Sequence, residues 1–422
     1  MSAGVPFDSP EARALEPVVH AAAARRALVL LSTAELLAMS LWFTGTAVIP
    51  QLAAEWHAGI GVTAWLTMAV QLGFVVGALL IAILNLPDLF RPTWIFVVSS
   101  LAAAAVNFAF AAVATQHETT AIALRFLTGA FLAGVYPTGM KILTGWFRQG
   151  RGLALGILIA ALTVGSALPH GVHAFGSLPW RWVVLVSSVL GVAAAIIVAV
   201  GVREGPYAAA QPPLNLLQVG EAFRNRPLRL ANYGYLGHMW ELYSMWGWIA
   251  VLLAASQQTV SSNQAELAAF FVIAIGAVGC IWAGVASDNT AAGDGPARVA
   301  QRAKVTVISM AVSGACCLLA AVVFDNFLAL LAVSLVWGIA VIADSAQFSA
   351  IISEVADHRY VGTALALQTS LGFLLTAGSL RAVAWVGATY GWRWAAASMA
   401  IGPALGIVAM LRIIRPGTQP VS

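Results

Sequence analysis

Charged residues are scarce in this sequence. Asp, Glu, Lys and Arg make up 9% of the 422 residues, whereas a soluble domain usually carries about 25%. Hydrophobic residues make up 60% instead, and they form runs of about 20 residues, which can cross a bilayer as helices. This composition excludes an ordinary soluble domain and predicts an all-α integral membrane protein.

Cysteine is also scarce, and no stretch resembles a cofactor motif. The three cysteines, Cys280, Cys316 and Cys317, lie inside apolar runs and have neither metal-ligand spacing nor a disulfide pattern. We therefore predict small core residues, no metal and no cofactor. Residues 1–26 lack the apolar core of a secretory signal, which predicts a short cytoplasmic tail.

The chain contains an internal duplication. Three pairs of landmarks recur about half a chain apart: PWRW at 179–182 with GWRW at 391–394, RGLAL at 151–155 with VGTAL at 361–365, and Asp88 with Asp288. A shared spacing across separate landmarks indicates two copies of one plan. The longest polar interruption, rich in proline and arginine, lies between the copies.

We predict twelve spanning helices in two duplicated six-helix bundles. The helices are expected near 27–50, 63–85, 93–114, 120–144, 152–173, 182–202, 229–254, 265–286, 304–324, 327–350, 361–384 and 393–413. The predicted domains are an amino-terminal tail (1–26), a first bundle (27–202), a cytoplasmic central loop (203–228), a second bundle (229–413) and a carboxy-terminal tail (414–422).

Lysine and arginine set the expected orientation, because they are retained on the cytoplasmic side of a membrane. With the amino terminus inside, the inner segments hold sixteen of them, and the outer loops hold only Arg181 and Arg393. The sixteen are Arg13, Arg25, Arg26, Arg91, Arg148, Arg151, Arg203, Arg224, Arg226, Arg229, Arg298, Arg302, Lys304, Arg359, Arg412 and Arg415. This bias predicts two cytoplasmic termini, and it explains the net charge of +4 without a nucleic-acid partner.

Several motifs resemble those of the major facilitator superfamily. RFLTG at 125–129 is similar to the family's Arg-x-x-x-Gly motif in helix 4, and WFRQGRGLALG at 146–156 resembles its helix 4–5 loop. NLPDLFR at 85–91 resembles its helix 2–3 loop, and GVASD at 284–288 resembles the repeat of that loop. With the duplicated halves, the resemblance covers essentially the whole chain and implies a twelve-helix transporter.

The resemblance also implies a gate. In the family, an acid and a base of the helix 2–3 loop latch the cytoplasmic gate, which implies gate roles for Asp88, Arg91 and Asp288. The glycine-rich signature of that loop is reduced here to one acid and one base. Helix 5 also lacks the Gly-Pro pair of many drug/proton antiporters, which weakens an assignment to that branch.

Ionisable side chains inside a bilayer are costly, so each is a functional candidate. Counted at 1.5 Å per residue from the nearest interfacial arginine, Glu35 lies about 13 Å deep and Glu241 about 18 Å deep. Asp344 is comparably deep. His170 and Arg381 fall near the outer boundary, where snorkelling and interface packing are the expected roles.

The deep residues lie on helices 1, 4, 7 and 10, which line the central cavity in the family. We predict proton-coupling roles for Glu241, His238, Asp344, Glu35 and Arg125, with Glu241 as the main acid. The expected substrate-binding residues are Trp42, Tyr136, Lys141, Tyr235, Met245, Trp248, Trp337 and Gln347. On helix 7 the candidates recur at spacings of three and four and share one face. The alternative is that His238 and Glu241 only bond each other and fix helix packing.

Two alternatives stay open on the fourth helix. Glu35 and Lys141 lie at similar depth and can form an ion pair; in the rival interpretation Lys141 binds an anionic substrate and Glu35 carries the proton. The arginine of the family motif influences the protonation of nearby acids, which implies that role for Arg125. A structural role, with the guanidinium bonded to backbone carbonyls at a helix crossing, is equally open.

The sequence thus predicts a secondary active transporter of the bacterial inner membrane, multi-pass and monomeric. It is expected to move a small organic solute by alternating access, driven by the proton gradient rather than by a cofactor. Acids slightly outnumber free bases in the expected cavity, which favours a cationic, zwitterionic or neutral solute. The alternatives are an efflux antiporter for drugs or metabolites, a copper-type metal carrier, and, from other classes, a membrane-embedded enzyme or a sensor.

Overall fold

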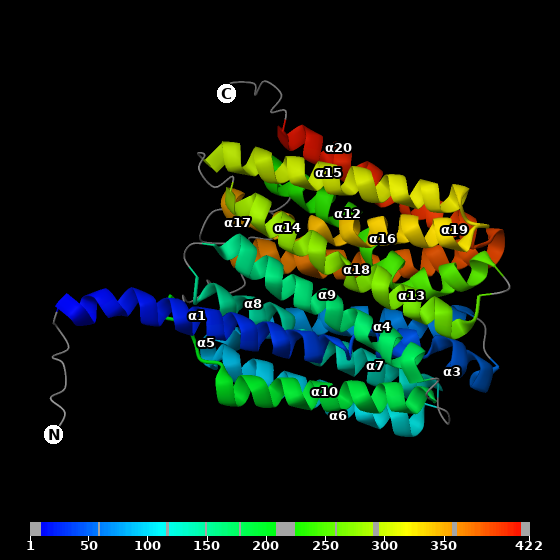
Figure 1. Ribbon diagram of the computed structural model, residues 1–422, viewed down its shortest axis with the longest axis horizontal. Coiled ribbons are helices and arrows are strands. Elements are labelled where there is room, and N and C mark those ends of the chain that lie inside the picture. Colours follow the sequence, from blue (N-terminus) through cyan, green and yellow to red (C-terminus); the bar gives the residue numbers. More distant parts are fainter. Residues whose placement is uncertain are drawn as a thin grey trace.

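All regular structure in the described part of the chain is helical (Figure 1). The computed structural model describes residues 10–57, 60–114, 118–147, 150–176, 179–207, 224–257, 260–289, 295–356 and 361–414. Figure 1 shows the helices running roughly along one axis, with α1 to α10 in the lower part of the view and α12 to α20 in the upper part. This is the all-α fold that the apolar runs predict.

The order of elements repeats the predicted halves. The first half consists of α1 (Pro10–Met39), α2 (Thr44–Ala47), α3 (Ile49–Trp56), α4 (Ile60–Ile83), α5 (Leu86–Leu89), α6 (Pro92–Val113), α7 (Glu118–Leu132), α8 (Tyr136–Thr144), α9 (Arg151–Gly176) and α10 (Trp180–Gly201). The second half consists of α12 (Arg226–Ser256), α13 (Ser262–Ala274), α14 (Gly276–Asn289), α15 (Gly295–Val322), α16 (Phe327–Ala343), α17 (Ser345–Val355), α18 (Val361–Tyr390), α19 (Trp392–Met399) and α20 (Ile401–Ile414). Helix α1 begins at Pro10, so it runs through much of the segment that we expected to be a tail.

Ten helical stretches of the described chain are long and apolar enough to cross a membrane. They match the predicted spans other than the first and the seventh. Those two correspond to α1 with α2 and α3, and to α12, which carries Asn, His, Glu and several Tyr and Ser side chains. A helix with that many polar groups is stable in a bilayer only when protein surrounds it, and most of the α12 side chains are buried.

Several predicted spans are split in the middle. The first breaks at residues 40–43, the fourth at 133–135 and the tenth at Asp344. In the fourth, Pro137 sits in the first turn of α8 and has no N–H to continue the ladder of α7, so the break follows from the sequence. The fourth and tenth spans occupy matching places in the two halves, and both breaks lie next to the centre of the molecule.

The two halves pack against each other along α4 with α18 and along α9 with α13 and α14. Glycines allow the second contact. A Cβ on Gly156 of α9 would lie 2.7 Å from the carbonyl oxygen of Cys280, and one on Gly284 of α14 would lie 2.8 Å from that of Gly152. A larger side chain at either position would push the halves apart.

The ends of the bundle differ in charge. Because successive spans alternate in direction, the starts of α6, α9 and α15 and the ends of α10 and α20 lie at one end of the bundle. In or next to these segments are Arg91, Arg151, Arg302, Arg203 and Arg412. We call this end the basic end. The opposite end, called the far end, carries Arg181 and Arg393 at the starts of α10 and α19.

Candidate functional site

Arg125 of α7 is fully buried and holds the break in the first span. Its guanidinium donates to the carbonyl oxygens of Leu41 (3.1 Å) and Trp42 (2.5 Å), and to the side chain of Asn107 on α6 (2.9 Å). Those carbonyls follow the end of α1, where a helix has unbonded acceptors and a cation is favourable. Asn107 in turn donates to Ser188 of α10, so the arginine joins four helical segments. These contacts match the structural alternative for Arg125, and its proton-coupling role stays a prediction.

Glu35 of α1 is fully buried, and neither of its carboxylate oxygens forms a hydrogen bond with a described residue. Oε2 lies against Gly139 of α8, where an added Cβ would come within 2.9 Å of it. Lys141 lies two residues farther along the same helix and is half-buried; the Glu35 oxygens accept no hydrogen bond from it, and the ion pair between the two side chains stays a prediction. Buried polar groups are nearly always bonded, so an unbonded carboxyl group at this place points to a functional role.

Tyr136 and Cys280 connect Glu35 with the second half. Tyr136, in the first turn of α8, is close enough to interact electrostatically with Glu35, with Tyr235 of α12 and with Cys280 of α14. Cys280 has the same relation to Asp344. Residues of both halves therefore form one polar region beside the breaks at 133–135 and Asp344, which we call the central polar region.

His238 and Asp344 form the part of this region that belongs to the second half. His238 Nδ1 of α12 lies 2.8 Å from Asp344 Oδ1, and both side chains are buried. Phe348 and Tyr235 pack against the imidazole, with ring centroids 5.5 and 6.0 Å away. His238 Nε2 has no hydrogen-bond partner in the described chain, so this nitrogen is available for a hydrogen bond to a polar solute.

Glu241 has a different environment from the one expected. Its carboxylate accepts hydrogen bonds from Ser313 and Cys317 of α15 (2.8 and 3.1 Å) and from Trp337 of α16 (2.8 Å). It therefore points into the second bundle, and Trp337 serves as its donor. The alternative in which His238 and Glu241 bond each other is wrong, because each has other partners. The reason is that α12 is buried on nearly every side, so residues of one sequence face contact different helices.

A cluster of aromatic rings joins the two halves. Trp42, Phe43, Phe74, Tyr243, Trp246 and Phe373 form this cluster, which we call the aromatic bridge. Phe74 of α4 and Phe373 of α18 have centroids 4.4 Å apart, and Trp42 lies 4.9 and 5.4 Å from them. The substrate-binding role of Trp42 stays a prediction.

Three other expected binding residues have the following surroundings, and their binding roles stay predictions. Trp248 donates to the Leu380 carbonyl and packs against Trp392 in a tilted arrangement, toward the far end. Gln347 accepts a hydrogen bond from Arg302 at the basic end (3.0 Å). Met245 is fully buried in the main core. The regular spacing of these residues was sufficient to predict burial, but the helix each one would face depends on the tertiary packing.

One polar network was missed altogether. His170 of α9 and Glu266 of α13 form a buried contact between the halves, with Nδ1 and Oε2 2.5 Å apart. His173 lies 3.9 Å from the other oxygen of Glu266, and its Nε2 contacts the amide of Gln51 at 2.7 Å. His170 was expected only to pack at the outer boundary. The acid was overlooked because it sits near the start of a predicted span, where charges are common.

The expected gate can be described only in part. Asp88 lies in α5 and Asp288 in α14, but their side chains are outside the described residues. Arg91 is exposed and lines a pocket between α6 and α10. The gate roles stay predictions. The cysteines are buried and unbridged, as expected, and the described residues contain no group of three His, Cys, Asp or Glu side chains that could hold a metal.

Comparison with known proteins identifies the family. The family model of the Major Facilitator Superfamily matches residues 30–299, so the chain belongs to that superfamily. A search of the curated proteins finds no significant match. Among solved structures, the fold is similar to a bacterial homologue of the human lysosomal transporter Spinster, in its inward-facing occupied form (TM-score 0.66, 12% identity, 92% of this chain and 96% of that one) and in its inward-facing unoccupied form (0.68, 14%, 94% and 99%). Family and fold together indicate a multi-pass secondary transporter.

Proposed function

We propose that the protein couples protons to the transport of a small polar organic solute across the cytoplasmic membrane of a bacterium. The observation that carries this proposal is the central polar region. Glu35 of the first half has no hydrogen-bond partner, and His238–Asp344 of the second half leaves His238 Nε2 unbonded. In a transporter that rocks two halves about a central site, both groups would be exposed to each side in turn.

A cationic or zwitterionic solute fits this region best. The Arg125 guanidinium donates to two backbone carbonyls and to Asn107, so its charge is not directed at the central polar region. Two carboxyl groups, Glu35 and Asp344, remain there with tyrosine hydroxyls and the aromatic bridge. Aromatic faces attract organic cations, and carboxylates pair with them. The basic end would lie in the cytoplasm by the bias of lysine and arginine.

The test is solute-driven proton movement into sealed proteoliposomes that contain the pH dye pyranine. Choline, betaine and lysine would be added outside, with glucose and succinate as neutral and anionic comparators. Wild-type vesicles should show a pH change with at least one of choline, betaine and lysine, and none with succinate. Empty vesicles should show no change. Solute exchange without any pH change would contradict proton coupling, while a response to succinate alone would contradict the charge preference.

A further inference from the structure

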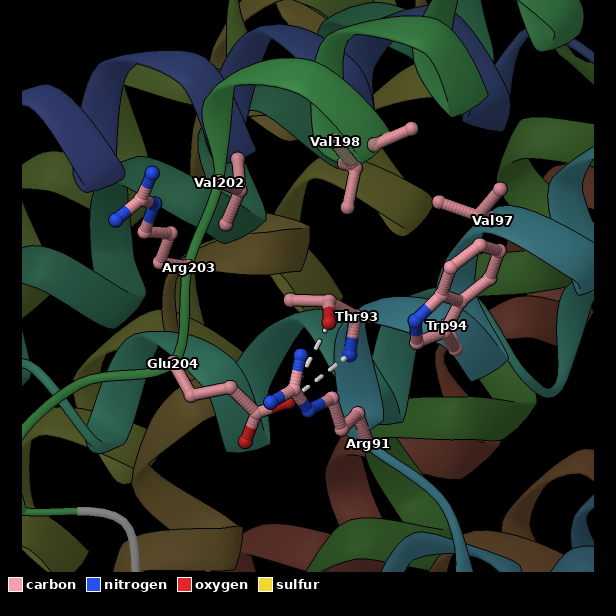
Figure 2. Close-up of a pocket in the computed structure, with 9 residues that line it drawn as sticks. Arg91, Thr93, Trp94, Val97, Val198, Val202, Arg203 and Glu204 are labelled. Carbon is pink, nitrogen blue, oxygen red and sulfur yellow. Dashed lines mark hydrogen bonds between the residues drawn. The ribbon is translucent and has the colours of Figure 1, made fainter.

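We propose that the pocket between α6 and α10 at the basic end binds the phosphate group of an anionic membrane phospholipid. This pocket of about 760 Å³ shares no lining residue with the central polar region, and Figure 2 shows the side chains that line it. Its lining residues are Arg91, Thr93, Trp94, Val97, Val198, Ala199, Val202, Arg203 and Glu204. The lining therefore combines two arginines with a largely aliphatic wall.

Contacts between distant segments shape the polar rim of the pocket. Glu204 accepts from the backbone N–H and the hydroxyl of Thr93 at 3.4 Å each, which ties the segment after α10 to the start of α6 (Figure 2). The carbonyl oxygen of Arg203 accepts from the Trp146 indole (2.9 Å). The backbone that carries Arg203 is thus held in place, while its side chain and that of Arg91 are exposed.

The apolar wall continues onto a surface that suits acyl chains. Val98 of α6 and Ile196 and Val200 of α10 are 60%, 56% and 84% exposed, although all three lie inside candidate membrane spans. Trp94 is 59% exposed at the rim, in the position of an interfacial tryptophan. The arginines stand where α6 begins and α10 ends, which is the level of the lipid phosphates.

The charge of the rim favours a lipid over free phosphate. Two arginines and one glutamate give a net charge of +1, which matches a phosphodiester with a single negative charge. Free phosphate and phosphate monoesters carry close to two negative charges, so the Glu204 carboxylate would repel them more strongly. Free phosphate also has no acyl chain to pack against the aliphatic wall. Arginine binds phosphate oxygens through two parallel N–H groups, so a pair of them can hold one headgroup.

The test is native mass spectrometry of the full-length protein after detergent delipidation and addition of phosphatidylglycerol. R91Q/R203Q should lower the fraction of protein with bound lipid by roughly tenfold or more, since each arginine near a lipid surface contributes about 1 kcal/mol. Ala199→Trp, which fills the aliphatic wall and keeps both arginines, should lower it as well. Arg412→Gln removes an exposed arginine of the basic end outside the pocket and should leave it unchanged.

Each other outcome overturns the assignment. An equal loss in Arg412→Gln would show general charge attraction, and unchanged binding in both R91Q/R203Q and Ala199→Trp would place the lipid elsewhere. Equal retention of phosphatidylcholine with the same acyl chains would remove the role of net charge. Displacement of the lipid by excess inorganic phosphate would identify the free anion as the ligand. Unchanged elution in size-exclusion chromatography would show that each variant is folded.

Discussion

Glu35 and Glu241 occupy comparable places in the two halves and have opposite environments. Each lies deep in the first long helix of its half, and each is buried. Glu241 accepts hydrogen bonds from three side chains, whereas neither oxygen of Glu35 has a hydrogen-bond partner in the described chain. A proton on Glu241 would weaken the hydrogen bonds that hold α12 to α15 and α16. Glu35 has no such bonds to break.

The comparison shows that depth in the membrane does not by itself assign a role to an acid. The partners decide whether a carboxyl group fixes the packing or stays available for protons and solute. Glu266 is intermediate, because its two oxygens face His170 and His173 across the interface between the halves. The three acids therefore form a series that mutation can test.

The largest effect is expected at Glu35. Glu35→Gln should reduce uphill uptake in a pH gradient to the level of empty vesicles, because the amide cannot carry a proton. Exchange of solute at equal pH should persist. The melting temperature should stay unchanged, since no hydrogen bond is lost. Glu118→Gln, an exposed acid at the start of α7, is the control and should transport normally. Normal uphill uptake by Glu35→Gln would contradict the assignment of proton coupling to Glu35 rather than Glu241.

The next effect is expected at the contact between the halves. His170→Leu or Glu266→Leu alone should cost roughly 3 kcal/mol of stability, since each strands a buried partner. The double variant should cost less than the sum of the two. Thermal melting of the three variants in detergent measures this. Additive losses would show that the 2.5 Å contact contributes no coupling between α9 and α13.

A smaller loss of stability is expected at Glu241. Glu241→Gln should cost about 1–3 kcal/mol, because the amide replaces one acceptor by a donor next to Ser313, Cys317 and Trp337. Uphill transport per folded molecule should stay near the wild-type value. The melting temperature, read beside that of Glu35→Gln, checks the first part. Loss of uphill transport with unchanged melting would return the coupling role to Glu241, as the sequence suggested.

The smallest effect is expected at Trp42. Its indole nitrogen has no hydrogen-bond partner in the described chain, so Trp42→Phe should keep the ring contacts with Phe74 and Phe373 and change stability by less than about 0.5 kcal/mol. If the indole N–H binds solute, the half-saturating solute concentration should rise by a few fold. Trp42→Ala, which removes the ring as well, should be clearly worse. Equal behaviour of the two variants would show that the aromatic bridge does not need this ring.

Sequence reasoning was sufficient for the features that depend on composition and period. Apolar runs predict the spans, the repeated motifs predict the halves, and Pro137 explains why the fourth span breaks. Contacts between helices could not be predicted in the same way. Glu241 and His238 are one turn apart on a helix that is buried nearly all round, so a shared face did not mean shared neighbours. Glu266 escaped notice because it lies near the start of a predicted span, and its contact with His170, 96 residues away in the other half, cannot be read from spacing.

The most direct test of the difference between the two acids is proton release or uptake when solute binds to purified protein. It would be followed with a pH indicator in weakly buffered detergent, using choline or whichever tested solute drives proton flux in vesicles. Wild-type protein and Glu241→Gln should exchange the same number of protons per bound solute, and Glu35→Gln should exchange fewer while it still binds. The account would be contradicted if Glu35→Gln exchanged as many protons per bound solute as the wild type and Glu241→Gln exchanged none.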